Sequence, residues 1–109
     1  MVREIVFDTE TTGFKPEEGH RLVEIGAVEL INHIPTGKHF HCYINPDRDM
    51  PIEAYNVHGL SEEFLRTHKR FYEVVDEFLE FIGDDSKLVA HNANFDMNFI
   101  NYELKAINK

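Results

Sequence analysis

The sequence predicts a single α/β domain, built on a mixed sheet of three antiparallel strands and a parallel fourth strand, with helices packed beside it. Three observations support this prediction. Three strand-like apolar segments follow one another within the first 44 residues, and a helical, a strand-like and a second helical segment come after them. Because the crossover between parallel strands is right-handed, the fourth strand is expected beside the first. A chain of 109 residues is long enough for one domain with a real core.

The first strand is expected at residues 3–8, where an uninterrupted apolar run at 5–7 indicates burial on both faces. A loop rich in glycine and proline follows at 12–20. Residues 21–31 are apolar on both parities apart from Glu24 and Glu29, which is typical of a central strand.

The third strand is expected at residues 39–44, with alternate side chains facing the core: Phe40, Cys42 and Ile44. Pro35 and Gly37 predict the hairpin connection that precedes it. Residues 45–50 have no regular pattern.

Two helical segments and a short strand are expected after this irregular region. Ser61 is a candidate N-cap for a short helix. An amphipathic helix that ends at Gly83 follows, with its apolar stripe at Phe71, Val74, Val75, Phe78 and Ile82. Residues 87–90 form the fourth strand.

The last helix has two acidic residues where burial is expected. At 100° per residue, Asp96 and Glu103 fall between two apolar stripes. One stripe consists of Ala93, Met97, Ile100, Leu104 and Ile107, and the other of Phe95, Phe99, Tyr102 and Ala106. A buried carboxylate needs a cation, a base or several donors. A simpler alternative for Asp96 is that a negative charge suits the first turn of a helix.

Asp8 and Glu10 form a pair of acids at the end of the first strand. Residues two apart in a strand point to the same side, with their backbones about 7 Å apart. Such a pair favours a hard divalent cation such as Mg²⁺, although a solvated strand end before a turn is an alternative. The crossover brings the start of the last helix near this pair. A shared metal therefore accounts for Asp8, Glu10 and Asp96 together.

Composition excludes several classes of protein. The net charge of −9 argues against a protein that grips a nucleic-acid backbone over many phosphates, so a partner would have to supply most of the affinity for such a substrate. No apolar run is long enough to cross a membrane, and the N-terminus lacks a signal-peptide pattern. The single Cys42 fits a reducing compartment, and we expect a cytoplasmic protein.

Five segments, in this order, resemble a known family: REIVFDTETTG, RLVEIGAVEL, FHCYINPDR, VHGLSEEF and LVAHNANFD. They are similar to the proofreading exonuclease (epsilon) subunits of bacterial DNA polymerase III, members of the DEDD 3′–5′ exonuclease superfamily with a ribonuclease H-like fold. The resemblance implies hydrolysis of the 3′-terminal phosphodiester of single-stranded or frayed DNA, in association with a polymerase catalytic subunit.

The resemblance also implies roles for individual residues. Asp8, Glu10 and Asp96 correspond to ligands of two divalent cations, Mg²⁺ or Mn²⁺, and so to catalytic positions. The positions that contact the substrate correspond to Asp8, Glu10, Thr11, Glu53 and His58. The VHGL and HNAxFD segments occur broadly in the superfamily, so a DEDD ribonuclease is an alternative.

The chain departs from the family pattern in one respect. The family has a third motif, with a general-base histidine and a fourth aspartate, but no histidine follows His91 and no aspartate follows Asp96. We therefore expect residues 1–109 to be a single, C-terminally truncated exonuclease domain with poor activity alone, or alternatively a catalytically silent interaction or vestigial module. Exposure of Phe95, Phe99, Tyr102 and the edge of the fourth strand is expected to favour self-association.

Overall fold

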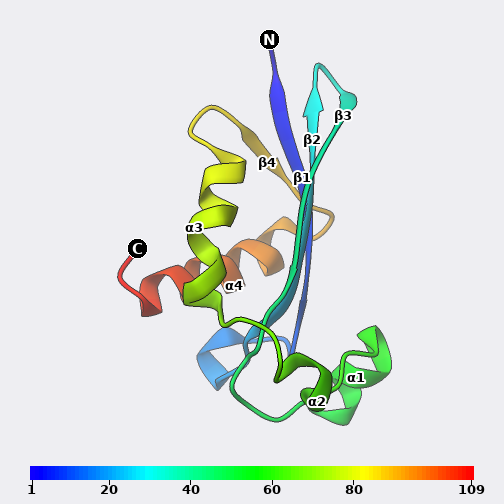
Figure 1. Ribbon diagram of the computed structural model, residues 1–109, viewed down its shortest axis with the longest axis vertical. Coiled ribbons are helices and arrows are strands. Elements are labelled where there is room, and N and C mark those ends of the chain that lie inside the picture. Colours follow the sequence, from blue (N-terminus) through cyan, green and yellow to red (C-terminus); the bar gives the residue numbers. More distant parts are fainter.

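The computed structural model, which describes residues 1–109, has the predicted sheet (Figure 1). Its four strands lie in the order β3-β2-β1-β4. They are β1 (Arg3–Thr11), β2 (Leu22–Ile31), β3 (Ile34–Tyr43) and β4 (Lys87–Val89). The pairs β1–β2 and β2–β3 are antiparallel, whereas β4 pairs with β1 in parallel. The fold prediction is therefore confirmed, including the position of the fourth strand beside the first.

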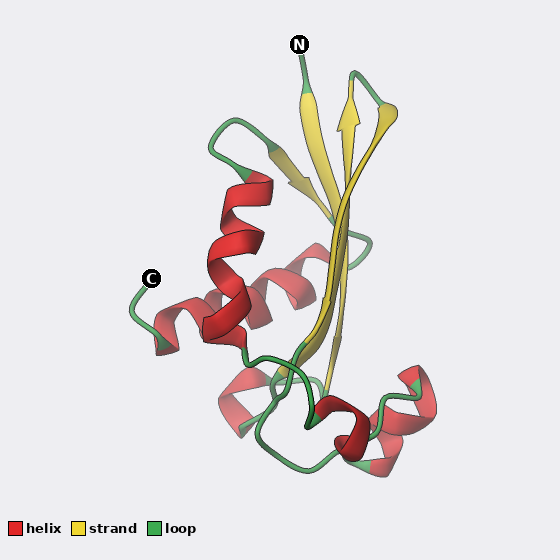
Figure 2. Cartoon of the chain, viewed as in Figure 1, coloured by secondary structure: helices red, strands yellow, loops and turns green.

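The helices lie on one face and at one end of this sheet (Figure 2). They are the 3₁₀ helix η1 (Pro16–Glu18) and the α-helices α1 (Ile52–His58), α2 (Glu62–Leu65), α3 (Phe71–Ile82) and α4 (Ala93–Ala106). Helices α3 and α4 cover the same face, and α1 and α2 lie beyond the end where β1 finishes (Figure 1). None of the helices is both long and apolar enough to span a membrane.

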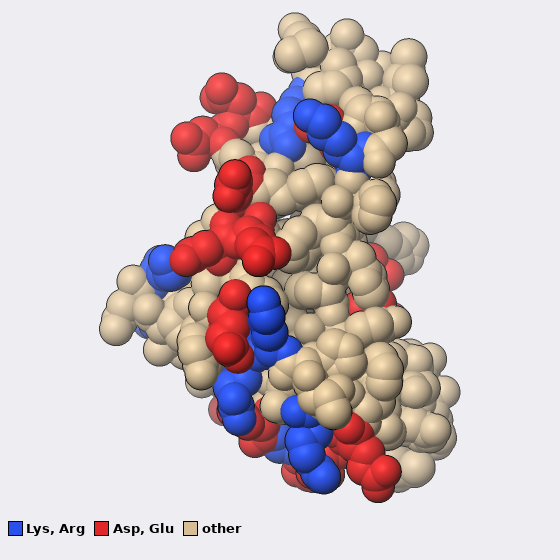
Figure 3. Space-filling view, viewed as in Figure 1, with Lys and Arg blue, Asp and Glu red and all other residues tan.

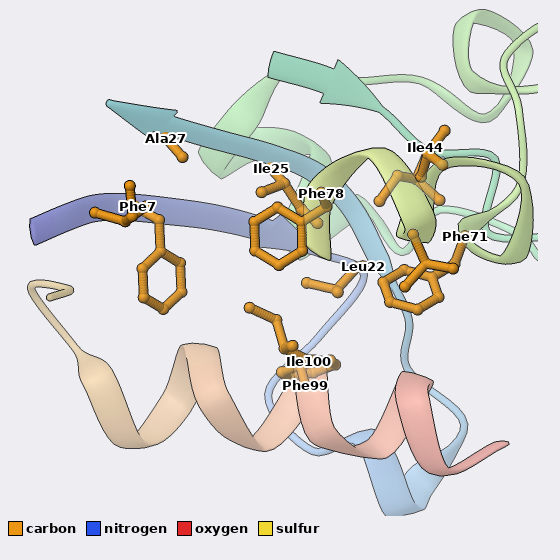
Figure 4. Packing of buried hydrophobic residues seen from close by; sticks show 12 residues of the cluster. Phe7, Leu22, Ile25, Ala27, Ile44, Phe71, Phe78, Phe99 and Ile100 are labelled. Atoms are coloured by element: carbon orange, nitrogen blue, oxygen red, sulfur yellow. The ribbon is translucent and has the colours of Figure 1, made fainter. Parts of the chain in front are cut away.

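The hydrophobic core lies between the sheet and the two long helices (Figure 4). Ile5 and Phe7 of β1 and Phe99 of α4 are almost completely buried. The expectation that the first strand is buried on both faces was wrong, because α3 and α4 both cover one face and Val6 on the other is only half-buried. The inward orientation of Phe40, Cys42 and Ile44 is confirmed by their packing in or against the core, as is the apolar stripe of α3.

The hairpin between β2 and β3 turns earlier than predicted. Asn32 and His33 form a two-residue turn with φ values of 49° and 69°, which matches the twist of the flanking strands. Pro35 and Gly37 therefore lie inside β3 and not in the connection. Proline is tolerated here because β3 is an edge strand.

Helix α1 was not predicted, because it has no buried residue and hence no apolar stripe to signal it. It follows Pro51 and ends at Gly59, whose φ of 73° glycine adopts without strain. The predicted N-cap at Ser61 is confirmed: its hydroxyl accepts a hydrogen bond from the backbone N–H of Phe64 at 3.0 Å. The predicted end of α3 at Gly83 is also confirmed.

Helix α4 buries both of its acidic residues, as predicted. Asp96 is 2% exposed and Glu103 is 3% exposed. The expected exposure of the aromatic residues is wrong for Phe99, which is fully buried because it packs into the main core. Phe95 is half-buried, and Tyr102 alone of the three is well exposed.

Candidate active site

The end of β1 carries polar side chains on both of its faces. Thr9 and Thr11 are buried, whereas Asp8 is exposed and Glu10 is half-buried. Since side chains alternate along a strand, Asp8 and Glu10 share the face opposite the two threonines. The register of the β1–β2 pair shifts between Glu10 and Thr11, so the ladder is irregular at this point.

The two buried carboxylates of α4 have different partners. Glu103 accepts two hydrogen bonds from the Arg21 guanidinium, at 2.9 and 2.7 Å, and one from the backbone N–H of Leu22 at 3.2 Å. Asp96 accepts a hydrogen bond from the hydroxyl of Thr9 and forms no ion pair. The charge of Glu103 is therefore compensated within the chain, and that of Asp96 is not.

The three predicted ligands affect one another electrostatically. Burial raises the pKa of Asp96, the Thr9 hydroxyl partly offsets this, and repulsion from Asp8 raises it further. Burial is also the main reason that the pKa of Glu10 is raised, and Asp8 adds to the effect. Glu10 and Asp96 thus both have raised pKa values, and a cation bound between them would favour their ionised forms.

The carboxylates do not form a complete ligand set in this arrangement. No three His, Cys, Asp or Glu side chains come close enough together to hold a metal ion. The candidate ligand atoms at this end of β1 are carboxylate oxygens, which suit a hard divalent cation. Asp96 also has no positively charged partner. The assignment of Asp8, Glu10 and Asp96 as metal ligands stays a prediction.

A pocket of about 400 Å³ adjoins this end of β1. Four of the predicted substrate-contact residues line it: Glu10, Thr11, Glu53 and His58. Asp8 and Asp96 lie outside its lining. The remaining lining comes from the β1 end, the following loop, α1 and α4: Thr9, Thr12, Gly13, Phe14, Lys15, Glu18, His20, Pro51, Ala54, Val57 and Phe95.

His58 joins α1 to the end of β1. Its Nδ1 accepts a hydrogen bond from the backbone N–H of Leu60 at 3.0 Å, and its Nε2 lies 3.0 Å from the carbonyl oxygen of Thr11. These partners require the hydrogen on Nε2, which donates to Thr11. His58 therefore fixes one wall of the pocket relative to the acids on β1.

Sequence reasoning missed two features of this region. The first is Thr9, which alternates in phase with Ile5 and Phe7 and therefore faces the core. This alternation is visible in the sequence and could have identified Thr9 as a partner of Asp96. The second is the loop wall of the pocket, including Phe14 and His20, for which no sequence signal was present because loop conformation decides their positions.

Comparison with known proteins shows close relatives. The chain is 56% identical over 108 residues to the DNA polymerase III subunit epsilon of Rickettsia typhi, covering 99% of this chain and 47% of the relative. It is 46% identical over 113 residues to the subunit of the same name from Escherichia coli K12, covering 100% of this chain and 46% of that protein. The chain thus spans about half the length of the curated relatives it matches.

Two solved exonuclease structures have the same fold. Exonuclease X, in complex with 5′ overhanging duplex DNA, is 27% identical with a TM-score of 0.72, covering 91% of this chain and 53% of that one. The nuclease domain of 3′hExo, a DEDDh family member bound to rAMP, is 18% identical with a TM-score of 0.79, covering 97% and 60%. At that identity the second similarity shows the fold alone. A family model described as Exonuclease, of the RNase T type, matches residues 5–109, and the chain belongs to this exonuclease family.

Proposed function

We propose that this chain provides catalytic residues of a 3′–5′ exonuclease that proofreads DNA during replication. The observation that carries the proposal is a set of acids whose charges act on one another: Asp8 and Glu10 near the end of β1, and the buried, uncompensated Asp96 of α4. Glu10 also lines a pocket of about 400 Å³. The names of the relatives, DNA polymerase III subunit epsilon, support the link to replication.

Enzymes of this family use divalent metal ions. Asp8, Glu10 and Asp96 would hold two such ions, Mg²⁺ or Mn²⁺, and the chemistry that bound ions would supply is activation of a water and stabilisation of the leaving 3′ oxygen. The Thr9 hydroxyl holds the Asp96 carboxylate at the start of α4. The four substrate-contact residues of the pocket would position the terminal nucleotide: Glu10, Thr11, Glu53 and His58.

Access to this site favours an unpaired strand end. A terminal nucleotide must leave its partner strand to enter a pocket, and a mismatched or frayed end does so at lower cost. The apolar side chains of Phe14, Val57 and Phe95 in the pocket lining suit one face of a base. Preferential removal of mismatched ends would follow from this difference in the cost of unpairing.

A partner would supply much of the substrate affinity. The chain carries a net charge of −9, and acidic side chains gather over α3 on the face shown in Figure 3. Such a surface repels the nucleic-acid backbone. We propose that the catalytic subunit of the replicative polymerase, in the cytoplasm, delivers the DNA 3′ end to this site.

The test is release of mononucleotides from single-stranded DNA labelled at its 3′ end, with Mg²⁺ or Mn²⁺. Asp8→Asn is expected to lower the rate by about 10²-fold or more. Glu80→Gln is the matched control, since this exposed acid lies on α3 outside the pocket. Because these 109 residues lack the family's third motif, the wild-type rate is expected to be low. Equal rates for wild type and Asp8→Asn would refute the proposal.

A further inference from the structure

The pocket contains a histidine to which no role has been assigned. His20 follows η1, precedes β2 and lines the pocket. Its Nδ1 lies 2.9 Å from the hydroxyl oxygen of Thr12 and 3.3 Å from a guanidinium nitrogen of Arg48. Thr12 is 1% exposed and His20 is half-buried, so the contact is partly shielded from water.

These contacts define the tautomer of His20. The Thr12 hydroxyl accepts a hydrogen bond from the backbone N–H of Arg21 at 3.0 Å, so its own hydrogen is free to point at Nδ1. Arg48 can only donate. Two donors directed at Nδ1 require a lone pair there, and the ring hydrogen is therefore on Nε2.

The ring is also fixed in orientation by close packing against Gly13. A Cβ at Gly13 would overlap Cε1, Nε2 and Cδ2 of the imidazole, so only glycine permits this approach. Within the protein, both hydrogen bonds of the His20 ring involve Nδ1, and Nε2 is not a buried atom without a partner. The Nε2–H is thus a free, preoriented donor on a residue that lines the pocket.

The charge of the pocket indicates what this donor binds. Three carboxylates and one ammonium group line the pocket, so a phosphate group entering it would be repelled: Glu10, Glu18 and Glu53 against Lys15. Apolar side chains beside them suit a base. An uncharged acceptor, such as a sugar oxygen or a base carbonyl, matches a neutral N–H donor in these surroundings.

We propose that His20 is a substrate-positioning residue whose Nε2–H donates a hydrogen bond to an uncharged acceptor on the nucleoside in the pocket. This inference rests on the proposed function, because that function makes a nucleotide the occupant of the pocket. Thr12, Arg48 and Gly13 act through His20 by fixing its tautomer and orientation.

The tautomer can be tested without activity. Long-range ¹H–¹⁵N NMR spectra of the ¹⁵N-labelled chain distinguish the two nitrogens of each neutral imidazole. The His20 signals are expected to show a protonated Nε2 and an unprotonated Nδ1, and Thr12→Val is expected to weaken this preference. A His20 ring with its hydrogen on Nδ1 in the wild-type chain would overturn the proposal.

Two substitutions distinguish a role of His20 in ligand binding from a role in the stability of the fold. His20→Asn retains an acceptor near the Nδ1 position but removes the Nε2–H, whereas His20→Gln retains a donor near Nε2 but removes the acceptor for Thr12. His20→Asn is expected to keep the melting temperature and to bind about three- to tenfold more weakly, the effect of one neutral hydrogen bond. His20→Gln is expected to show the reverse: lower melting temperature and affinity near that of the wild type.

The probes are thymidine and thymidine 5′-monophosphate, each titrated by NMR into the wild-type chain and both variants with Mg²⁺ present. If the acceptor lies on the nucleoside, His20→Asn weakens both probes by the same factor. A loss confined to the monophosphate, or equal binding by wild type and His20→Asn, would overturn the proposal. The exonuclease assignment is decided separately, by whether hydrolysis depends on Asp8.

Discussion

At the scale of single residues, α4 contains two buried acids in contrasting environments. Arg21 and a backbone N–H compensate the charge of Glu103, whereas Asp96 has one hydroxyl donor and raised pKa. Such uncompensated burial lowers stability and is typical of residues kept for function. From this difference we infer a structural role for Glu103 and propose a functional role for Asp96.

Substitution of each acid by its amide tests this difference. In EDTA at neutral pH, Asp96→Asn is expected to raise the free energy of unfolding by about 0.5–2 kcal/mol, because the amide carries no charge and still accepts from Thr9. Glu103→Gln is expected to lower it by about 2 kcal/mol, because the half-exposed Arg21 loses its partner. Urea unfolding measures both. Destabilisation of similar size in the two variants would show that Asp96 has a structural role.

At the scale of elements, Arg3 and Glu29 connect three strands with a helix. Arg3 donates to Glu29 at 2.6 Å and to the carbonyl oxygens of Phe81 and Ile82 at the end of α3. The Thr36 hydroxyl of β3 donates to the same carboxylate. These contacts explain a buried acid in a largely apolar central strand. They also hold the pKa of Glu29 below its usual value, Arg3 being the main cause.

The Glu29 contacts predict a pH-dependent stability. Because the pKa is lower in the folded than in the unfolded chain, the stabilisation is complete above the unfolded-state pKa of about 4.5 and is lost as the pH falls through the folded-state value. Glu29→Gln is therefore expected to be less stable than the wild type at pH 7, with a difference that shrinks as the pH falls below about 4.5. Thermal unfolding across this range measures it. A difference that does not change with pH would contradict the role of the carboxylate.

Most elements could be predicted from the sequence because apolar periodicity determines them. The strand order followed from the handedness of the crossover, and the burial of Asp96 and Glu103 followed from the angular positions on α4. The hairpin turn at Asn32 and His33 could not, because Pro35 and Gly37 gave a stronger turn signal nearby. Helix α1 has no buried face, so it left no periodic pattern.

The candidate site was predictable in its residue types but not in its geometry. The spacing of Asp8 and Glu10 and the position of Asp96 identified acids that interact electrostatically, since the charge of Asp8 helps to raise the pKa of both Glu10 and Asp96. Their distances depend on the irregular end of β1 and on how α4 packs, which no local pattern contains. The role of His20 depends on loop contacts with Thr12 and Gly13, and was equally beyond the sequence.

At the scale of the whole molecule, the negative charge of the chain affects how a nucleic-acid substrate would be bound. The net charge of −9 and the acidic side chains over α3 oppose broad contact with a nucleic-acid backbone (Figure 3). In the proposed function, the pocket and the acids at the end of β1 would bind a single nucleotide without such contact. Under the proposed function, catalysis by this chain would therefore depend on delivery of the substrate by a partner.

The scarcity of contacts to phosphate groups predicts that DNA binding depends only weakly on salt concentration. For a single-stranded oligonucleotide in EDTA, the slope of log K against log salt is expected to be shallower than about −2, because few phosphates are neutralised. Fluorescence anisotropy between low and physiological salt measures the slope. A steep slope would reveal a basic binding surface and contradict the need for a partner.

Diffraction from crystals soaked in Mn²⁺ tests the central claim most directly, because anomalous scattering locates the ion independently of activity. We expect anomalous peaks bounded by the carboxylates of Asp8, Glu10 and Asp96, with those side chains drawn together around the ions, and loss of the peaks in Asp8→Asn. Crystals of the wild-type chain that show these carboxylates apart, with manganese bound only elsewhere, would contradict the account.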